Sequence, residues 1–358
     1  MDSTRYRILI PRETLSRVGD YRRLLVARPN QAGGRLRQRL RTQDLAVLSD
    51  LDLLGALFET KVPQIFAESA VVGDGSDWNL TELGLLGDVS VAVPVTIFDN
   101  GNHDEPTPHP APFPGTLVFT PGALLDSGRG LTPADWNEAT KGGQISPEGL
   151  YQLYQRRWLP VFEYIDRHAP GPRSALVTIP GIGCGQFAGP FRGQLGPHLQ
   201  AVLLRFLREH GASFPRLKAV YFDPYSQCGN ERYEVNGISL LIRPLTAAGN
   251  WAKSQLCRPV DYAEPGDDFS GCTLFSLVAW DHVSWPGNDF FLGARATDDG
   301  VKAAATSSMG ALTGLEGTYD PARAKYQPPH PFRFWEEVVE RHRLRLWNRA
   351  AVWSPAAE

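Results

Sequence analysis

The chain has 358 residues, of which 42% are hydrophobic and 21% are charged, and its formal net charge is −3 at pH 7. This composition is typical of a soluble globular protein, and the small negative charge gives no reason to expect nucleic-acid binding. No apolar run approaches the roughly 20 residues that span a bilayer, and residues 1–17 lack the apolar segment of a secretory signal peptide. We therefore expect a cytoplasmic protein that binds neither nucleic acid nor membrane.

Residues 1–85 are predicted to be mostly helical, with an interruption at Gly33-Gly34. Thr42-Gln43-Asp44 supplies helix-start signals before leucines at three-to-four spacing, which predicts an amphipathic helix there. The pattern then changes to β-branched residues that alternate with small ones. This predicts a strand over 89–97 that ends at Asp99-Asn100-Gly101.

The middle of the chain combines helix and strand signals. The proline-rich segment 106–114 is predicted to be a loop and 117–119 a short strand. Ser146-Pro147 opens a long helix, in which Pro160 predicts a kink. Further strands are predicted at 175–179, 219–222, 238–242 and 274–279, and further helices at 195–207 and 332–349. The order strand, helix, strand over 175–222 is a β-loop-α-β unit, which implies a parallel sheet and an α/β fold.

The four cysteines lie far apart and form no C-x-x-C pair; they are Cys184, Cys228, Cys257 and Cys272. We expect reduced thiols, with neither disulfides nor a zinc site. We expect no cofactor.

A glycine-rich loop lies between a predicted strand and a predicted helix, in the sequence IPGIGCGQFAGP over 179–190. Its glycines leave backbone amides uncovered, and the N-terminus of the helix that follows would add partial positive charge, which suits a diphosphate. The loop is not a Walker A motif, because no Gly-Lys-Ser/Thr follows. It also departs from the Rossmann fingerprint, since Gln186 occupies the third glycine position. The alternative is a tight turn whose glycines serve packing alone.

Four aspartates, Asp281, Asp289, Asp298 and Asp299, follow the apolar run 274–280 within one turn-rich segment. Polar loops at strand ends are where α/β proteins usually place their chemistry. Turn formation and helix capping account for one or two of these carboxylates but poorly for all four.

Together these elements resemble a macrodomain, the fold that binds ADP-ribose. The resemblance implies a macrodomain-like mixed sheet between helices over 86–320. Outside this range, the residue patterns predict a mostly helical extension over 1–85 and a C-terminal helix over 321–358 packed on the core. The GIGCGQFAGP string resembles the diphosphate loop, and DDGVKAAA over 298–305 resembles the element that lines the distal ribose. The two occur in reverse order compared with most macrodomains, which suggests a circularly rearranged topology.

The resemblance also implies which residues bind ADP-ribose. Backbone amides of the glycine loop would hold the diphosphate, and Asn288, Gly300 and Val301 would surround the distal ribose. The loop residues concerned are Gly181, Ile182, Gly183, Cys184, Gly185, Gln186 and Phe187.

A closer similarity is to the MavL-type group of bacterial effector macrodomains, which remove ADP-ribose from arginine, including arginine-modified ubiquitin. Their pattern is similar to Asp281-x7-Asp289-x9-Asp299 within WDHVSWPGNDFF and TDDGVKAAATSSM. This implies hydrolysis of the N-glycosidic bond to an arginine guanidinium, in the cytosol of a host cell if the protein is an effector. Asp289 and Asp299 would orient the ribose and activate water, Asp281 would contact the guanidinium, and Asp298 would cap a helix or contact the ribose. The paired glutamates of poly(ADP-ribose) glycohydrolases are absent.

Two other functions use the same residues. In one, the aspartates bind Mg²⁺, as in ADP-ribosylhydrolases with a dinuclear metal centre, although those enzymes resemble helical bundles. In the other, the protein is a reader or adaptor that binds ADP-ribose without turnover.

Several further residues have a structural explanation that we favour. Phe187 and Phe290 would more often pack in a core than against a ribose or adenine. Asp99 and Asp268 are candidates for the adenine amino group, with turn formation the better explanation of both. His282 is interpreted as structural, because neighbours at a strand end point in opposite directions.

Overall fold

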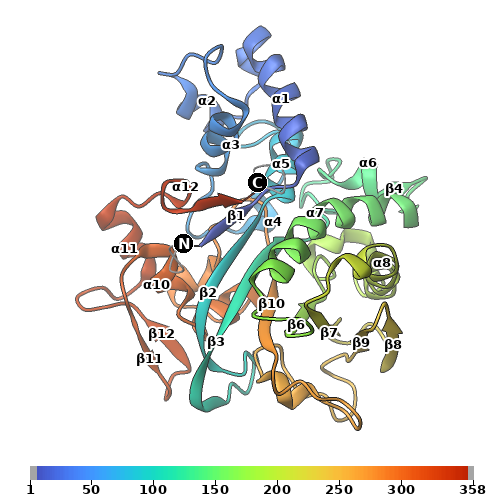
Figure 1. The fold of residues 1–358 in the computed structure, drawn as a ribbon. Coiled ribbons are helices and arrows are strands. Elements are labelled where there is room, and N and C mark those ends of the chain that lie inside the picture. The colour runs from blue at the N-terminus through green and yellow to red at the C-terminus, as the bar shows by residue number, and fades with distance from the viewer. Residues whose placement is uncertain (1–5, 354–358) are drawn as a thin grey trace.

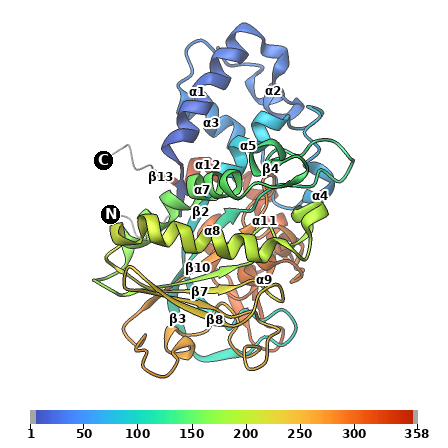
Figure 2. The same ribbon diagram turned by 90° about the vertical axis from the view of Figure 1, so that its right-hand side faces the viewer.

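The computed structural model describes residues 6–353, and its centre is a large mixed sheet with helices on both faces (Figures 1 and 2), which confirms the predicted fold class. The first and last five residues of the predicted terminal extensions lie outside the described part. Within residues 6–353 the sheet has nine strands, which in spatial order are β13 (Ala351–Trp353), β1 (Arg7–Leu9), β2 (Ser90–Asp99), β3 (Pro108–Pro121), β10 (Thr273–Trp280), β6 (Ala175–Pro180), β7 (Leu217–Asp223), β9 (Ile238–Ile242) and β8 (Glu231–Val235).

The central five strands, β3, β10, β6, β7 and β9, run parallel, so their carboxyl ends meet at one edge of the sheet. β2 pairs antiparallel with β3, and β8 pairs antiparallel with β9. The last of these five strands in the chain, β10, lies between β3 and β6 rather than at the outside. Segments about 100 residues apart in sequence, the ends of β6 and β10, therefore become neighbours.

Alternating side chains of the strands fill two separate cores. In β6, Val177 and Ile179 pack with α7 (Pro147–His168) and α8 (Leu195–His210), whereas Leu176 belongs to the core on the opposite face. That second core includes side chains from α1 (Arg12–Ala27), α2 (Gly34–Leu40), α3 (Asp50–Phe58), α4 (Ala67–Ala70), α5 (Leu80–Asp88), α9 (Asp298–Ala304), α10 (Ser308–Thr313), α11 (Trp335–His342) and α12 (Leu346–Arg349). The remaining elements are α6 (Trp136–Ala139) and the short pairs β4 (Thr140–Lys141) with β5 (Gln144–Ile145) and β11 (Thr318–Asp320) with β12 (Lys325–Gln327).

The predicted β-loop-α-β unit is confirmed, because β6 and β7 are parallel neighbours joined through α8. The prediction of a loop over 106–114 is wrong, because β3 begins at Pro108 and pairs with β2 as far as Asp99. The φ angle of proline suits an extended backbone, and the prolines of this segment lie on its exposed part, where a missing amide donor costs little.

The predicted start of the third helix near Thr42 is also wrong. The helix α3 begins at Asp50, where Ser49 accepts a 3.1 Å hydrogen bond from the Asp52 amide and the Asp52 carboxylate accepts one from the Ser49 amide. This capping box satisfies two amides that would otherwise lack partners, so it determines the helix start.

The two ends of the chain differ from the predicted helical extensions. β1 and β13 pair with each other and join the main sheet beside β2. The single helix predicted over 332–349 is wrong: α11 ends at His342, because Arg343 adopts a left-handed conformation and the Leu344 amide bonds the Val339 carbonyl. The chain then forms α12 and β13.

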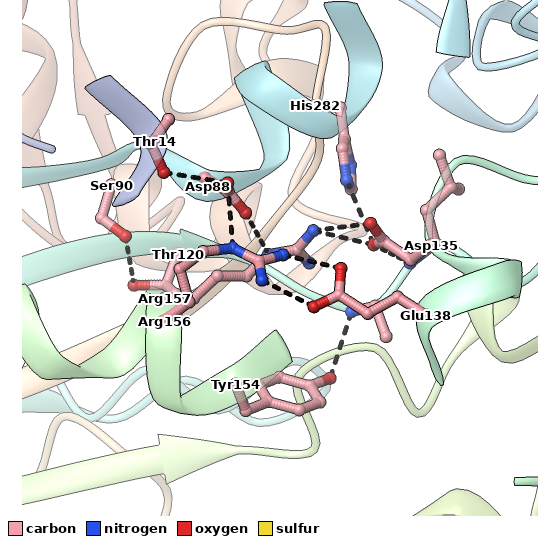
Figure 3. Close-up of polar contacts among 12 residues, drawn as sticks. Thr14, Asp88, Ser90, Thr120, Asp135, Glu138, Tyr154, Arg156, Arg157 and His282 are labelled. Atoms are coloured by element: carbon pink, nitrogen blue, oxygen red, sulfur yellow. Dashed lines mark hydrogen bonds and ion pairs between the residues drawn. The ribbon is translucent and has the colours of Figure 1, made fainter. Parts of the chain in front are cut away.

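A buried ion network ties the N-terminal helices to the sheet (Figure 3). Arg157 of α7 is fully buried and donates to both carboxylate oxygens of Asp135, at 2.9 and 2.8 Å, and to the Gly122 carbonyl at 2.7 Å. Its Nε lies 3.4 Å from Asp88, at the end of α5. Burial alone would raise the pKa of Asp135, but the Arg157 guanidinium holds it well below its ordinary value.

Replacing Arg157 with Met should lower the free energy of unfolding by about 3–5 kcal/mol, because it leaves the Asp135 carboxylate buried without its arginine. Asp88 loses one cation but keeps its ion pairs with Arg17 and Arg156. Chemical denaturation of the variant measures this loss. The matched control is Arg205→Met on the exposed side of α8, where the ion pairs of Arg205 are solvated and a much smaller change is expected. Equal losses in the two variants would contradict the role assigned to the network.

Candidate functional site

A cavity of about 690 Å³ opens at the carboxyl ends of β6, β7 and β10. Its walls come from the glycine loop after β6, the turn after β7, the end of β10 with Asp281, the segment 296–299, and Ala67 and Glu68 of α4. The structure thus brings the glycine loop and the aspartate segment to one cavity, at the edge where open parallel sheets bind ligands.

The glycine loop is held in shape by Tyr154 of α7, whose hydroxyl donates to the Ile182 carbonyl at 2.7 Å and accepts from the Ala123 amide at 3.1 Å. Gly183 has φ of +80°, and a Cβ there would lie 2.7 Å from the Tyr154 oxygen and 2.9 Å from the Ala123 nitrogen. The position therefore requires glycine.

Several backbone N–H groups of this loop have no acceptor among residues 6–353, including those of Gly183, Gly185, Gln186 and Phe187. Successive free amides at a cavity wall form a concave donor surface for an anion. The helix predicted after the loop is confirmed as α8, which begins at Leu195, but the 3-10 segment Gln186–Phe191 lies between the glycines and its N-terminus. The positive charge here comes instead from Arg192, which lines the cavity and donates to the Gln186 side chain at 3.1 Å.

Asp281 lines the cavity, yet both of its carboxylate oxygens are occupied. One accepts from the amides of Val283 and Ser284, each at 2.7 Å, and the other from the Ser284 hydroxyl at 2.5 Å and the Asn288 amide at 3.2 Å. Asp281 thus organises its own turn. Asn288 also lines the cavity, but its side chain mainly bonds the backbone of Ile65, accepting at 3.0 Å and donating at 3.1 Å.

Asp289 and Asp299 face the same hydroxyl group, that of Thr297. A hydroxyl has one proton, so it can donate to only one of the two carboxylates at a time. Asp289 also accepts from the Ala296 amide at 2.8 Å and from the Thr297 amide at 3.2 Å. Gly300 allows this approach, because a Cβ there would lie 1.9 Å from the Asp289 carboxylate.

Among the four aspartates, Asp299 has a carboxylate oxygen that is both buried and without a hydrogen-bond partner. It is 3% exposed and lines the cavity, and its Oδ2 is buried without a hydrogen-bond partner, while its Oδ1 accepts from the Gly300 amide at 2.9 Å. Burial raises the pKa of Asp299 well above its ordinary value, and the negative charge of Asp281 raises it further. A carboxyl with a raised pKa and a vacant oxygen is suited to acid–base work.

The hydrogen bonds of Asp298 have a structural role. Its Oδ2 accepts from the Ala279 amide at 2.7 Å and from Lys302 Nζ at 3.1 Å, which joins α9 to the end of β10. The suggestion that it caps the helix is wrong, because Thr297 is the N-cap and accepts from the Gly300 amide at 3.2 Å. Asp298 does line the cavity.

Other predicted ligand residues lie away from the cavity surface. The side chain of Ile182 is fully buried in the core beside α7 and α8, and the side chains of Val301 and Phe290 are buried as well. The Gly300 amide is already paired with Asp299 and Thr297. The remaining predicted loop residues do line the cavity: Gly181, Gly183, Cys184, Gly185, Gln186 and Phe187.

The minor candidates Asp99 and Asp268 do not line the cavity. Asp99 pairs with Arg295 at 2.9 Å through both oxygens and accepts from Tyr319 at 2.8 Å. Asp268 forms a turn with Ser270, as favoured from the sequence. The prediction that Asp281 and His282 point in opposite directions is confirmed, since His282 is fully buried with its Nε2 3.8 Å from Asp135 (Figure 3).

The sequence analysis missed Asp223 and Tyr225, which line the end of the cavity beyond β7. Asp223 accepts from the amides of Tyr225 and Leu245, each at 2.8 Å, and burial raises its pKa. Tyr225 is 57% exposed and has φ of 60°. An Asp-Pro pair directly after a predicted parallel strand was the available signal, because that strand ends at the same edge as the glycine loop.

Within residues 6–353, no group of three or more His, Cys, Asp or Glu side chains is placed to hold a metal ion. All four cysteines are free thiols, and burial raises the pKa of Cys184 to about 12. No helix in this part of the chain is both long and apolar enough to cross a membrane.

A mixed sheet between helices, with a glycine loop and an acidic turn on one cavity, defines a macrodomain-like α/β protein. The family model described as macrodomain effector MavL matches residues 6–332, and the chain belongs to this family. No curated protein matches the chain. Family membership connects the cavity to the binding or processing of ADP-ribose.

Asp299→Asn should stabilise the fold at neutral pH. The folded-state pKa of Asp299 is raised, so the stability that its neutral form provides is lost as pH rises through that pKa. The advantage of the variant should be absent below pH of about 4 and grow with pH, by about 1.4 kcal/mol for each unit of the pKa rise.

Denaturant unfolding between pH 4 and 8 measures this difference. The control is Asp268→Asn, at an exposed carboxylate whose pKa is lowered by its hydrogen bond from Ser270, where no gain in stability is expected. A stability difference between the Asp299 variant and the wild type that does not change with pH would show that this carboxyl is not strained by burial.

Proposed function

We propose that the protein hydrolyses the N-glycosidic bond between the distal ribose of ADP-ribose and an arginine side chain of a modified protein. The observation that carries the proposal is the vacant, buried Asp299 oxygen in the same cavity as the free amides of the glycine loop. A volume of about 690 Å³ suits a ligand of this size.

In this proposal the diphosphate accepts hydrogen bonds from the free amides of 183–187, with Arg192 supplying a counter-charge. The distal ribose then reaches the aspartate side of the cavity, and the adenine reaches Asp223 and Tyr225. An aromatic face and a carboxylate suit adenine, because the base offers a flat ring and an amino donor.

The proposed chemistry separates the ribose carbon from the guanidinium nitrogen while water adds to that carbon. Positive charge develops on the ribose in the transition state, and the surrounding carboxylates stabilise it. Asp299 takes the proton from the attacking water. The guanidine departs as a neutral group and receives a proton in turn, so the products are ADP-ribose and an unmodified guanidinium.

The other three aspartates have supporting roles in this proposal. Asp289 uses its oxygens on the segment 296–297, so it orients Thr297 and, through it, Asp299. Asp281 attracts the guanidinium through its charge. Asp298 fixes the end of β10 beside the ribose. The family resemblance suggests ubiquitin as one modified protein.

A reader without turnover is the second candidate. Both oxygens of Asp281 are already bonded within the protein, an arrangement that suits a rigid binding surface. Measuring binding and release separately distinguishes the two functions, since a reader binds ADP-ribose and leaves the modified arginine intact.

Asp299→Asn should lower the rate of ADP-ribose release from arginine-modified protein by roughly 10²–10⁴-fold, because the acid–base group is lost. The affinity for free ADP-ribose should change little. The assay follows free ADP-ribose from arginine-, serine- and glutamate-linked substrates, with arginine-modified ubiquitin included, and with and without a chelator. Asp268→Asn is the matched control and should keep full activity.

A fully active Asp299→Asn protein would remove the mechanism. Loss of activity in chelator would favour the metal-dependent alternative. Binding of ADP-ribose without release from any substrate would establish the reader.

Gly183→Ala should weaken ADP-ribose binding by at least tenfold, because the added methyl group pushes the loop away from Tyr154 and Ala123 and misaligns its amides. Calorimetric titration with ADP-ribose measures the affinity. Gly171→Ala is the control, since Gly171 lies in the loop before β6 and an added Cβ meets no atom within 4 Å. Equal affinity in both variants would place the ligand elsewhere.

A further inference from the structure

The segment after α3, residues 60–66, lies along the aspartate turn. The Val62 amide donates to the Val283 carbonyl at 3.1 Å, and the Trp285 amide donates to the Val62 carbonyl at 2.7 Å. Ile65 holds the Asn288 side chain through both of its backbone groups. The N-terminal part of the chain therefore forms a support for one wall of the cavity.

Lys61 is the charged group in this segment. Its side chain is buried, 3% exposed, and its Nζ donates to the His282 carbonyl at 2.6 Å and to the Asp281 carbonyl at 3.5 Å. The ammonium also lies 3.9 Å from the centre of the Trp280 ring. Both hydrogen-bond acceptors are backbone carbonyls, so no carboxylate oxygen bonds directly to this buried charge.

Burying an ammonium group is costly, and an apolar side chain of similar length would fill the same volume at lower cost. The charge of Lys61 does act on the site, since Asp281 is the group that favours its protonated form. Lys61 binds the backbone carbonyls of Asp281 and His282. The next two residues of the same turn, Val283 and Ser284, donate their amides to the Asp281 carboxylate. Removing Lys61 would free two carbonyls at the base of that turn.

We propose that Lys61 is a positioning residue, which fixes the turn 281–285 and balances the negative charge of the aspartates from beneath the cavity. This inference rests on the proposed hydrolysis. In this proposal the N-terminal part of the chain contributes to the reaction, because Lys61 belongs to it.

The titratable groups that interact with Lys61 are Asp281 and His282. Burial lowers the pKa of Lys61 to about 7, against the attraction of Asp281. Burial also lowers the pKa of His282, so its ring is neutral in this range. The unfolded chain binds more protons than the folded chain above pH 7, so fold stability rises with pH there. The rate should fall over the same range, because Lys61 loses its charge. If Lys61 had only a structural role, the rate would instead rise with pH together with the fold stability.

The test compares Lys61→Met and Lys61→Arg with Lys141→Met, a control at an exposed lysine of the β4–β5 hairpin. For Lys61→Met we expect kcat to fall at least tenfold, KM and the affinity for ADP-ribose to change less than threefold, and the decline of the rate above pH 7 to disappear. Lys61→Arg keeps the charge and should recover part of kcat. Lys141→Met should match the wild type.

Amide hydrogen exchange over 281–285 provides a readout that does not need activity. Exchange there should be at least tenfold faster in Lys61→Met than in the wild type, with exchange elsewhere unchanged. Unchanged exchange and unchanged kcat would overturn the proposal. If the Met variant does not fold, a wild-type rate that stays flat through pH 7 would overturn it. If the wild type releases no ADP-ribose from any substrate, the proposed function fails, and the exchange result still decides the role of Lys61.

Discussion

Parallel pairing of β10 with both β3 and β6 is the constraint on which the site depends. Because the three strands point the same way, the glycine loop after β6 and the aspartate turn after β10 leave the sheet at one edge and enclose one cavity. Had β10 been added at the outside of the sheet, the two segments would lie several strands apart, at about 4.8 Å for each strand. The topology thus assembles the site from distant parts of the sequence.

The second organising feature is the way in which buried charged groups are hydrogen-bonded around the cavity. The aspartates of the cavity wall are largely satisfied by backbone amides and hydroxyls, and one buried oxygen among them, Oδ2 of Asp299, is left without a partner. Two buried lysines lie beside this cluster: Lys302 binds the Leu277 carbonyl and Asp298, and Lys61 binds the carbonyls of Asp281 and His282. Burying these charges lowers the free energy of unfolding, and it leaves the unpartnered Oδ2 of Asp299 able to react.

The sequence was sufficient to predict the α/β class, the unit from β6 to β7, and two of the segments that line the cavity, the glycine loop and the aspartate turn, because hydrophobic period and turn residues act locally. It was insufficient where distant contacts decide the structure. The proline-rich start of β3 is extended because β2 pairs with it, and β1 and β13 are strands because β1 pairs with β2 and β13 pairs with β1. Likewise, the support that Ile65 gives Asn288 depends on folding, and no local pattern marks it.

The most direct test of the central claim is a crystal structure of the Asp299→Asn protein with ADP-ribose bound. The account predicts that the diphosphate lies on the amides of 183–187 and that the anomeric carbon of the distal ribose faces the side chain at position 299, within reach of one water molecule. A ligand bound in another cavity, or one whose distal ribose points away from 281–299, would contradict it.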